Sequence, residues 1–205
     1  SGIMDLTGEP DGEPQKMGVA FADIFTGLYG VIAIQSALRV REQSQKGQHI
    51  DLSLMDSMVA VLANQASNYF VSGKSPKRMG NKHPNIVPYQ VFQVKDGHLI
   101  IAVGNNEQFE RFCKVIGLDY LYSSEEYNNN QKRVQNREKL VEIITSKTKQ
   151  YNKNDLKSLL EENNVPVGSV NDIEEVFNDP QVKYRKLKIN MTYKNAKKGY
   201  TQSIR

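Results

Sequence analysis

The longest apolar pattern in the chain runs from Gly18 to Arg41. Its hydrophobic residues recur mostly three or four positions apart, with others between them, which is typical of a largely buried helix. They are Val19, Phe21, Ile24, Phe25, Leu28, Val31, Ile32, Ile34 and Leu38. Gly27 and Gly30 lower the helix propensity but allow another backbone to approach closely. We therefore predict a buried helix over this range.

The segments on either side of this helix differ in pattern. Residues 7–14 are too rich in glycine and proline for a helix or a central strand and indicate a loop. After Gly47, polar and apolar residues alternate from His49 to Leu54, which predicts a half-buried strand. A second helix is expected from Met55 to about Val71. Residues 72–88 are rich in turn-forming residues, which indicates a domain boundary or a long functional loop.

The second half of the chain alternates short strands with amphipathic helices. Tyr89–Val94 and His98–Val103 flank an Asp-Gly pair, which is a strong hairpin signal. Asn105, with Gln108 three residues later, predicts a helix cap before Phe109–Ile116. Further helices are expected at 131–148, 154–163 and 171–177, with a break at 165–168, and a strand at 187–193. This mixture predicts the α/β fold class.

Composition limits the class of protein. The 205 residues are 39% hydrophobic and 24% charged, which fits one large or two small globular domains. No uncharged apolar run of membrane-spanning length appears, and no leader-like start, so we expect no membrane partner and a cytoplasmic or organelle-matrix location. Cys113 is the only cysteine, and the three histidines share no ligand spacing, so no disulfide and no metal site are expected.

Charge is distributed unevenly along the chain. The net charge is +4, and the segment from Lys183 to Arg205 contains several lysines and arginines but no acid. Such a tail attracts phosphate, on nucleic acid or on a nucleotide, or it is simply a solvated surface. The two common glycine-rich phosphate-binding motifs are absent from the sequence.

Asp23 is an acidic residue within an apolar segment. One interpretation is an N-cap, with the helix starting there and the carboxylate accepting backbone N–H bonds. The other is a poorly hydrated carboxylate at a helix N-terminus, acting as nucleophile or base. Asp51, on the expected strand, and Asp56, as a cap of the next helix, are interpreted as structural. Cys113 is interpreted as a buried thiol rather than a nucleophile.

The segment from Arg78 to Pro84 combines glycine, an amide and positive charge. Such a combination suits a lid that contacts an anion, and it is equally compatible with a plain linker. The residues of interest in it are Gly80, Asn81 and His83.

Several stretches, taken in order, resemble one enzyme family. Residues 18–29 (GVAFADIFTGLY), 47–56 (GQHIDLSLMD) and 80–90 (GNKHPNIVPYQ), with further matches at 165–168 and 176–182, are similar to the class III CoA-transferases, the formyl-CoA transferase and carnitine CoA-transferase family. The closest likeness is to the branch that moves CoA between dicarboxylic acids such as succinate, glutarate and hydroxymethylglutarate.

The resemblance implies a mechanism. The family's catalytic aspartate falls on Asp23, which would form an anhydride and then a CoA thioester. Gly80, Asn81 and His83 would bind substrate in a loop that covers the intermediate. Coenzyme A enters as a thioester substrate, with a carboxylic acid as the second substrate, no bound cofactor and no nucleic-acid partner.

The resemblance also implies an architecture. It predicts the end of a Rossmann-like large domain at residues 1–72, a connecting loop at 73–89, a small α/β domain at 90–182 and a return segment at 183–205. Two such proteins would interlock as ring-shaped homodimers, in the cytoplasm or, in a eukaryote, in the mitochondrial matrix. The chain has about half the family's usual length, and the half that carries most CoA contacts is not in it.

Two other functions stay open from the sequence. A 2-methylacyl-CoA racemase of the same superfamily would use an aspartate at the same position with a histidine as an acid/base pair. A non-catalytic module would use the basic tail to bind nucleic acid, although aromatic residues at base-stacking spacing are missing.

Overall fold

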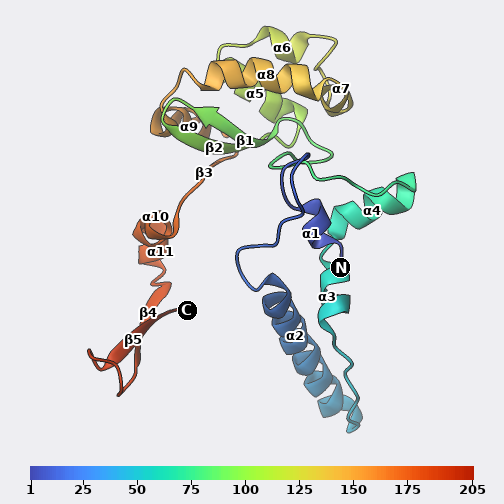
Figure 1. Ribbon diagram of the computed structural model, residues 1–205, viewed down its shortest axis with the longest axis vertical. Helices are drawn as coiled ribbons and strands as arrows, with labels where there is room; N and C mark the ends of the chain where they lie inside the picture. The colour runs from blue at the N-terminus through green and yellow to red at the C-terminus, as the bar shows by residue number, and fades with distance from the viewer. The chain divides into compact units, whose positions relative to one another are not determined.

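The computed structural model describes the whole chain, Ser1 to Arg205. Contacts group its residues into two compact units, Ser1–Pro84 (unit 1) and Asn85–Arg205 (unit 2). Helices and strands are mixed along the chain (Figure 1), which confirms the α/β class predicted from the sequence. The finer domain limits stay a prediction.

Unit 1 consists of helices and connecting segments. The helices are α1 (Ile3–Leu6), α2 (Phe21–Ser44), α3 (Leu54–Ala60) and α4 (Ala63–Ser72). The second helix expected from the sequence is thus two helices, separated where Ala63 has a φ of 47°. A residue with positive φ interrupts helical geometry, and this ends the first helix.

The strand predicted from His49 to Leu54 is wrong. Residues 49–53 form no strand, and Leu54 begins α3. Alternation of side chains is not sufficient, because a strand also needs a neighbouring strand for its N–H and C=O groups, and unit 1 contains none. Ser53 instead caps α3, its Oγ accepting from the backbone N–H of Asp56 at 3.0 Å.

Helix α2 is where the sequence predicted it, but it is not buried in this chain. Gly30 is its only buried residue, whereas Val31 and Ile32 are 59% and 62% exposed. A Cβ on Gly30 would lie 3.1 Å from Cδ2 of Leu52, and nothing lies within 4 Å of a Cβ on Gly27. The close approach of another backbone to these glycines, expected from the sequence, is therefore not found. By length and apolar composition alone, α2 could also cross a membrane, which the sequence analysis did not expect. Core helices of soluble proteins have the same length and composition.

Unit 2 is built around a three-stranded antiparallel sheet in the order β1-β2-β3. Strands β1 (Tyr89–Val94) and β2 (Gly97–Ala102) form the predicted hairpin, with Phe92 opposite Leu99. Strand β3 (Val167–Ser169) pairs with β2, although the sequence indicated only a break there. The pairing joins residues far apart in the chain, which local patterns do not reveal.

Helices cover this sheet and supply the core of unit 2. They are α5 (Asn106–Val115), α6 (Tyr120–Ser123), α7 (Asn130–Gln135), α8 (Arg137–Thr148) and α9 (Lys153–Glu162), and Figure 1 shows α5 and α8 lying over the hairpin. The Oδ1 of Asn105 accepts from the N–H of Gln108 at 2.8 Å, which confirms the predicted cap. The fully buried core side chains include Leu99, Ile101, Phe112, Leu140, Ile144, Leu156 and Leu160.

The C-terminal part of unit 2 contains two short helices and a separate hairpin. Helix α10 (Ile173–Asn178) begins with a capping box formed by Asp172 and Glu175, and α11 (Pro180–Tyr184) follows. Strand β4 (Lys188–Thr192) confirms the strand expected at the end of the chain, and it pairs with β5 (Tyr200–Ile204).

Candidate functional site

Asp23 lies in the first turn of α2. The N-cap of the helix is Ala20, and no side chain caps the helix end. The interpretation of Asp23 as the N-cap is therefore wrong, because the helix begins two residues before it. The side chain of Asp23 is exposed.

A cavity of about 450 Å³ contains Asp23 in its wall. The remaining wall comes from the N-terminal residues, from the segment that enters α2 and from α3. The lining residues are Ser1, Ile3, Met4, Lys16, Met17, Gly18, Val19, Ala20, Phe21, Ala22, Asp23 and Met58. Asp23 and Lys16 carry the only charged side chains among them, and most of the other side chains are apolar.

The end of the helix favours a negative charge in this cavity. The first N–H groups of a helix have no partner inside it, and the helix dipole places partial positive charge there. Because no side chain caps α2, its first turn can present N–H groups to a ligand or to a developing oxyanion. A carboxylate with apolar neighbours and nearby backbone donors can act as a nucleophile on an acyl group.

Met58 is a site residue that the sequence did not reveal. It is 4% exposed and belongs to α3, and its side chain contributes to the cavity that holds Asp23. Its position in a helical apolar pattern is the same as that of an ordinary core residue, so no signal in the sequence separates the two roles.

The structure does not bring Gly80, Asn81 and His83 into this cavity. Gly80 has a φ of 58°, and its N–H donates to the carbonyl of Gly8 at 3.0 Å. A Cβ on Gly80 would lie 2.9 Å from Oε2 of Glu9, so both conformation and space favour glycine. The substrate-binding role of the three residues stays a prediction.

The other aspartates considered from the sequence are Asp51 and Asp56. Asp51 is exposed in the segment that forms no strand. Asp56 lies in the first turn of α3, but the cap of that helix is Ser53, so the prediction that Asp56 caps it is wrong. Neither residue lines the cavity with Asp23. No group of three or more His, Cys, Asp or Glu side chains is placed to hold a metal ion.

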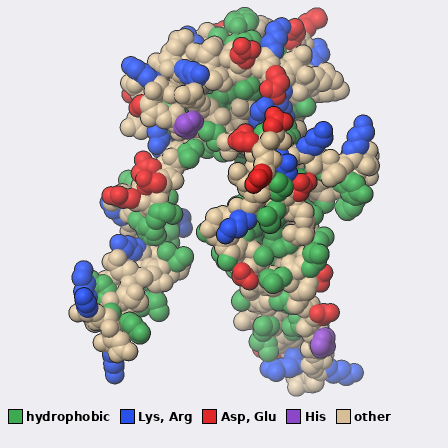
Figure 2. Space-filling view, in the orientation of Figure 1, with side chains coloured by type: hydrophobic (Ala, Val, Ile, Leu, Met, Phe, Trp, Pro, Cys, Tyr) green, Lys and Arg blue, Asp and Glu red, His purple; other side chains and the backbone are tan.

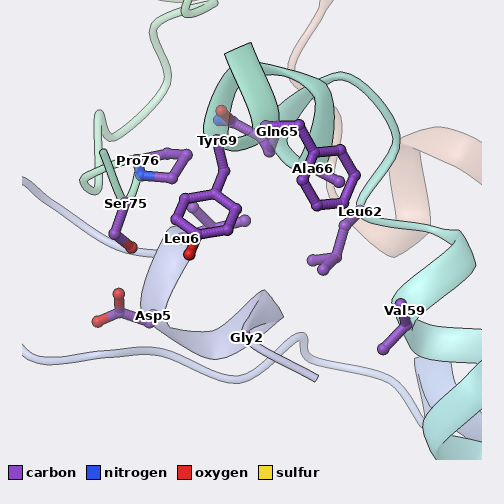
Figure 3. A pocket seen from close by; sticks show the side chains of 11 residues that line it. Gly2, Asp5, Leu6, Val59, Leu62, Gln65, Ala66, Tyr69, Ser75 and Pro76 are labelled. Atoms are coloured by element: carbon purple, nitrogen blue, oxygen red, sulfur yellow. The ribbon is translucent and has the colours of Figure 1, made fainter. Parts of the chain in front are cut away.

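A second cavity in unit 1, of about 410 Å³, lies between α1, α3 and α4. Figure 3 shows the Tyr69 ring beside Leu6 and Pro76, with the Asp5 carboxylate at the edge. That carboxylate is paired with Arg78, at 2.9 Å from Nη1. The cavity can hold an apolar group, and it offers no free acid or base for chemistry.

Cys113 lies in the core of unit 2 and lines neither of the cavities described above. Its side chain is fully buried, and burial raises the pKa of the thiol from 9.0 to about 12. The thiol is therefore protonated and inaccessible at neutral pH, which confirms its interpretation as a structural residue.

This shift predicts an alkaline loss of stability. Between pH 9 and 12 the folded state keeps the Cys113 proton and the unfolded state loses it, so the free energy of unfolding falls as pH rises, by up to about 1.4 kcal/mol per pH unit. The Cys113→Ala variant should lack this contribution. Denaturant unfolding at several pH values from 8 to 11 measures both slopes, and equal slopes would contradict the prediction.

Comparison with known proteins places the chain in a family. The model of CoA-transferase family III matches residues 1–203. The chain is 51% identical to succinate--glutarate CoA-transferase of Agrobacterium fabrum, over 93% of this chain and 48% of that protein. It is 38% identical to human succinyl-CoA:glutarate CoA-transferase, over 94% of this chain and 44% of that protein.

A solved structure agrees with these relatives. A CAIB/BAIF family protein from Brucella suis superposes with a TM-score of 0.74 at 51% identity, covering 100% of this chain and 56% of that one. The chain spans about half the length of the curated relatives it matches. Because the family model extends over nearly every residue and the relatives agree with it, the chain belongs to CoA-transferase family III.

Proposed function

We propose that the protein containing this chain transfers CoA from an acyl-CoA to a dicarboxylic acid, with Asp23 as the nucleophile. The observation that carries the proposal is the exposed Asp23 carboxylate at the uncapped start of α2, in the wall of a mostly apolar cavity. Two relatives are named as CoA-transferases of succinate or succinyl-CoA and glutarate, and these names support a dicarboxylate as acceptor.

The proposed reaction has four substitutions at carbonyl carbons. A carboxylate oxygen of Asp23 attacks the donor thioester, the C–S bond breaks, and CoA thiolate leaves behind a mixed anhydride. The thiolate then attacks the aspartyl carbonyl, which releases the donor acid and forms an aspartyl-CoA thioester. The acceptor carboxylate attacks that thioester, the C–S bond breaks, and a second anhydride forms as CoA thiolate is released. The thiolate finally attacks the acyl carbonyl of the acceptor, which gives the acceptor's CoA thioester and restores the Asp23 carboxylate. An anhydride or a thioester is present at every stage, on the donor, on Asp23 or on the acceptor, so the free energy of the donor thioester is not lost to hydrolysis.

Other residues of the chain would assist these steps. Backbone N–H groups in the first turn of α2 are suited to stabilise the oxyanion of each tetrahedral intermediate. The loop containing Gly80, Asn81 and His83 would bind substrate and exclude water from the anhydride. Coenzyme A is a substrate in this scheme, and the homodimer and the cytoplasmic or mitochondrial-matrix location implied by the family resemblance belong to the same proposal.

Trapping the covalent intermediate tests the proposal. The natural polypeptide that contains residues 1–205 is mixed with succinyl-CoA, quenched in acid, digested and analysed by mass spectrometry. We expect one CoA on the peptide that carries Asp23, and its loss on treatment with hydroxylamine, which cleaves thioesters. An adduct on another residue, or CoA exchange without an adduct, would overturn the assignment.

The same preparation distinguishes the two other functions. A racemase would exchange the α-proton of a 2-methylacyl-CoA with solvent and form no CoA adduct. A nucleic-acid module would bind an oligonucleotide with an affinity that falls steeply with salt. We expect neither behaviour.

A further inference from the structure

Two side chains of α7 hold the segment that directly follows the Gly80–Pro84 loop. The Oδ1 of Asn130 accepts from the N–H of Val87 at 3.1 Å, and its Nδ2 donates to the carbonyl of Asn85 at 2.8 Å. One amide thus satisfies a donor and an acceptor two residues apart, and this fixes the orientation of that backbone.

Arg133, one turn later in α7, binds the same segment from the interior of unit 2. It is fully buried, and its Nε donates to the carbonyl of Val87 at 2.7 Å. Its other donors reach the carbonyl of Tyr127 and Oδ1 of Asn106, each at 3.0 Å. The guanidinium also lies 4.4 Å from the centre of the Phe109 ring.

The partners of Arg133 are unusual for a buried cation. All three hydrogen-bond acceptors are neutral, and burial lowers the pKa of the guanidinium to about 10. Removing a charge from water is costly, and without a carboxylate only part of that cost is recovered. A gain in stability alone therefore explains this arginine poorly, whereas a need to hold particular backbone carbonyls explains it directly.

Further hydrogen bonds and burial hold α7 and the segment that it binds. Asn129 caps α7 by accepting from the N–H of Lys132 at 3.0 Å. Val87 is fully buried, and the carbonyl of Pro88 accepts from the N–H of Val103 at 3.0 Å. Side chains of α7 thus bind the N–H of Val87 and the carbonyls of Asn85 and Val87, and the residue after β2 binds the carbonyl of Pro88.

We propose that Asn130 and Arg133 are positioning residues for the substrate-covering loop, which they anchor at its C-terminal end by fixing Asn85 and Val87. The inference rests on the proposed function, in which the loop of Gly80, Asn81 and His83 excludes water from an acyl anhydride. A loop whose end is free to move opens more often, and each opening admits water that hydrolyses the activated acyl group. The anchor therefore controls the ratio of CoA transfer to hydrolysis.

Two variants weaken the anchor in different ways. Asn130→Asp keeps the size of the side chain and an acceptor for Val87, but it places a carboxylate oxygen against the carbonyl of Asn85. Arg133→Met removes all three hydrogen bonds and keeps an apolar side chain of similar length. Asn130 is partly exposed, so its variant tests the inference even where Arg133→Met does not fold.

Thr148→Val is the matched control. The Oγ1 of Thr148 donates to the carbonyl of Gln93 at 2.8 Å, which ties the other end of β1 to α8. Its replacement removes a partly buried hydrogen bond to β1, the strand that begins two residues after Val87, with a loss of stability comparable to that of Asn130→Asp, and leaves Asn85 and Val87 untouched.

The experiment measures two products in the natural polypeptide that contains the chain. With succinyl-CoA and glutarate, glutaryl-CoA reports transfer and the free thiol reports hydrolysis. We expect Asn130→Asp to lower the ratio of transfer to hydrolysis by about tenfold, the factor that corresponds to the loss of one hydrogen bond, and Arg133→Met, which removes three, to lower it at least as much. Hydrogen exchange of residues 80–88 should become faster in the same variants, and Thr148→Val should change neither quantity.

The outcomes separate the two proposals. If the unmodified protein transfers no CoA, the proposed function fails. If it transfers CoA and Asn130→Asp keeps both the wild-type ratio and the wild-type exchange of residues 80–88, the anchoring role fails. An equal fall of the ratio in Thr148→Val would likewise overturn it, because general destabilisation would then account for the effect.

Discussion

The Asp23→Asn variant is expected to lower the rate of CoA exchange between succinyl-CoA and glutarate by about four orders of magnitude or more, the range found when a catalytic nucleophile is removed. An amide has the shape of a carboxylate, but its nitrogen lone pair is delocalised and it carries no charge, so it attacks a thioester very slowly. The formation of labelled glutaryl-CoA from labelled glutarate and succinyl-CoA, measured over a wide range of enzyme concentration, checks this prediction.

Asp56→Asn is the control for this substitution. Asp56 is exposed and lies in the first turn of a helix of the same unit, as Asp23 does, but it does not line the cavity. The same chemical change there should leave the exchange rate within about twofold, because surface substitutions have small effects. Undiminished exchange in Asp23→Asn, or an equal loss in Asp56→Asn, would remove the role assigned to Asp23.

The second large effect concerns the apolar surface of α2. We expect the 205-residue chain, produced by itself, to bind the dye ANS strongly and to self-associate at micromolar concentration. Figure 2 shows hydrophobic side chains gathered over the α2 and α3 part of unit 1. Monomeric proteins rarely leave so many apolar side chains exposed together. Those of α2 are Ile24, Leu28, Tyr29, Val31, Ile32, Ile34, Leu38 and Val40.

A pair of variants tests the origin of this association. Ile32→Gln should weaken self-association by about tenfold, because full burial of one such side chain contributes about 1.5–3 kcal/mol. Ile204→Gln changes an isoleucine in β5 that is somewhat more exposed, at 71% against 62%, and should have little effect, since its neighbours Gln202, Ser203 and Arg205 are polar. A monomeric chain without dye binding would contradict the prediction, and sedimentation with neutral lipid vesicles would instead assign α2 to a membrane.

Local signals predicted the elements whose hydrogen bonds are local. The Asp96-Gly97 turn and the alternation around it predicted the β1–β2 hairpin, where Gly97 has a φ of 157° that disfavours other residues. Asn105 predicted the start of α5 because a cap needs only residues within one turn. The strand at His49–Leu54 was predicted wrongly for a related reason. The alternation of its side chains is a local signal, but a strand also needs a partner strand, which a local signal does not show.

The candidate site divides in the same way. The sequence singled out Asp23 as an acid among apolar residues, and the family resemblance favoured it as the nucleophile. Whether its carboxylate capped the helix depended on where α2 begins, and only the structure, with Ala20 as N-cap, decided that. The sequence did not reveal Met58 as a lining residue, because this role depends on the packing of α3 beside the start of α2.

By itself, the sequence determined the fold class, the family likeness and most helices, because hydrophobic period, caps and turn residues act over a few neighbouring positions. The tertiary structure alone decided the pairing of β3 with β2, the cavity around Asp23 and the hold of Arg133 on Val87, a donor and an acceptor separated by 46 positions. Such contacts depend on how elements pack, and a chain can bring many different pairs of distant residues together with the same local pattern.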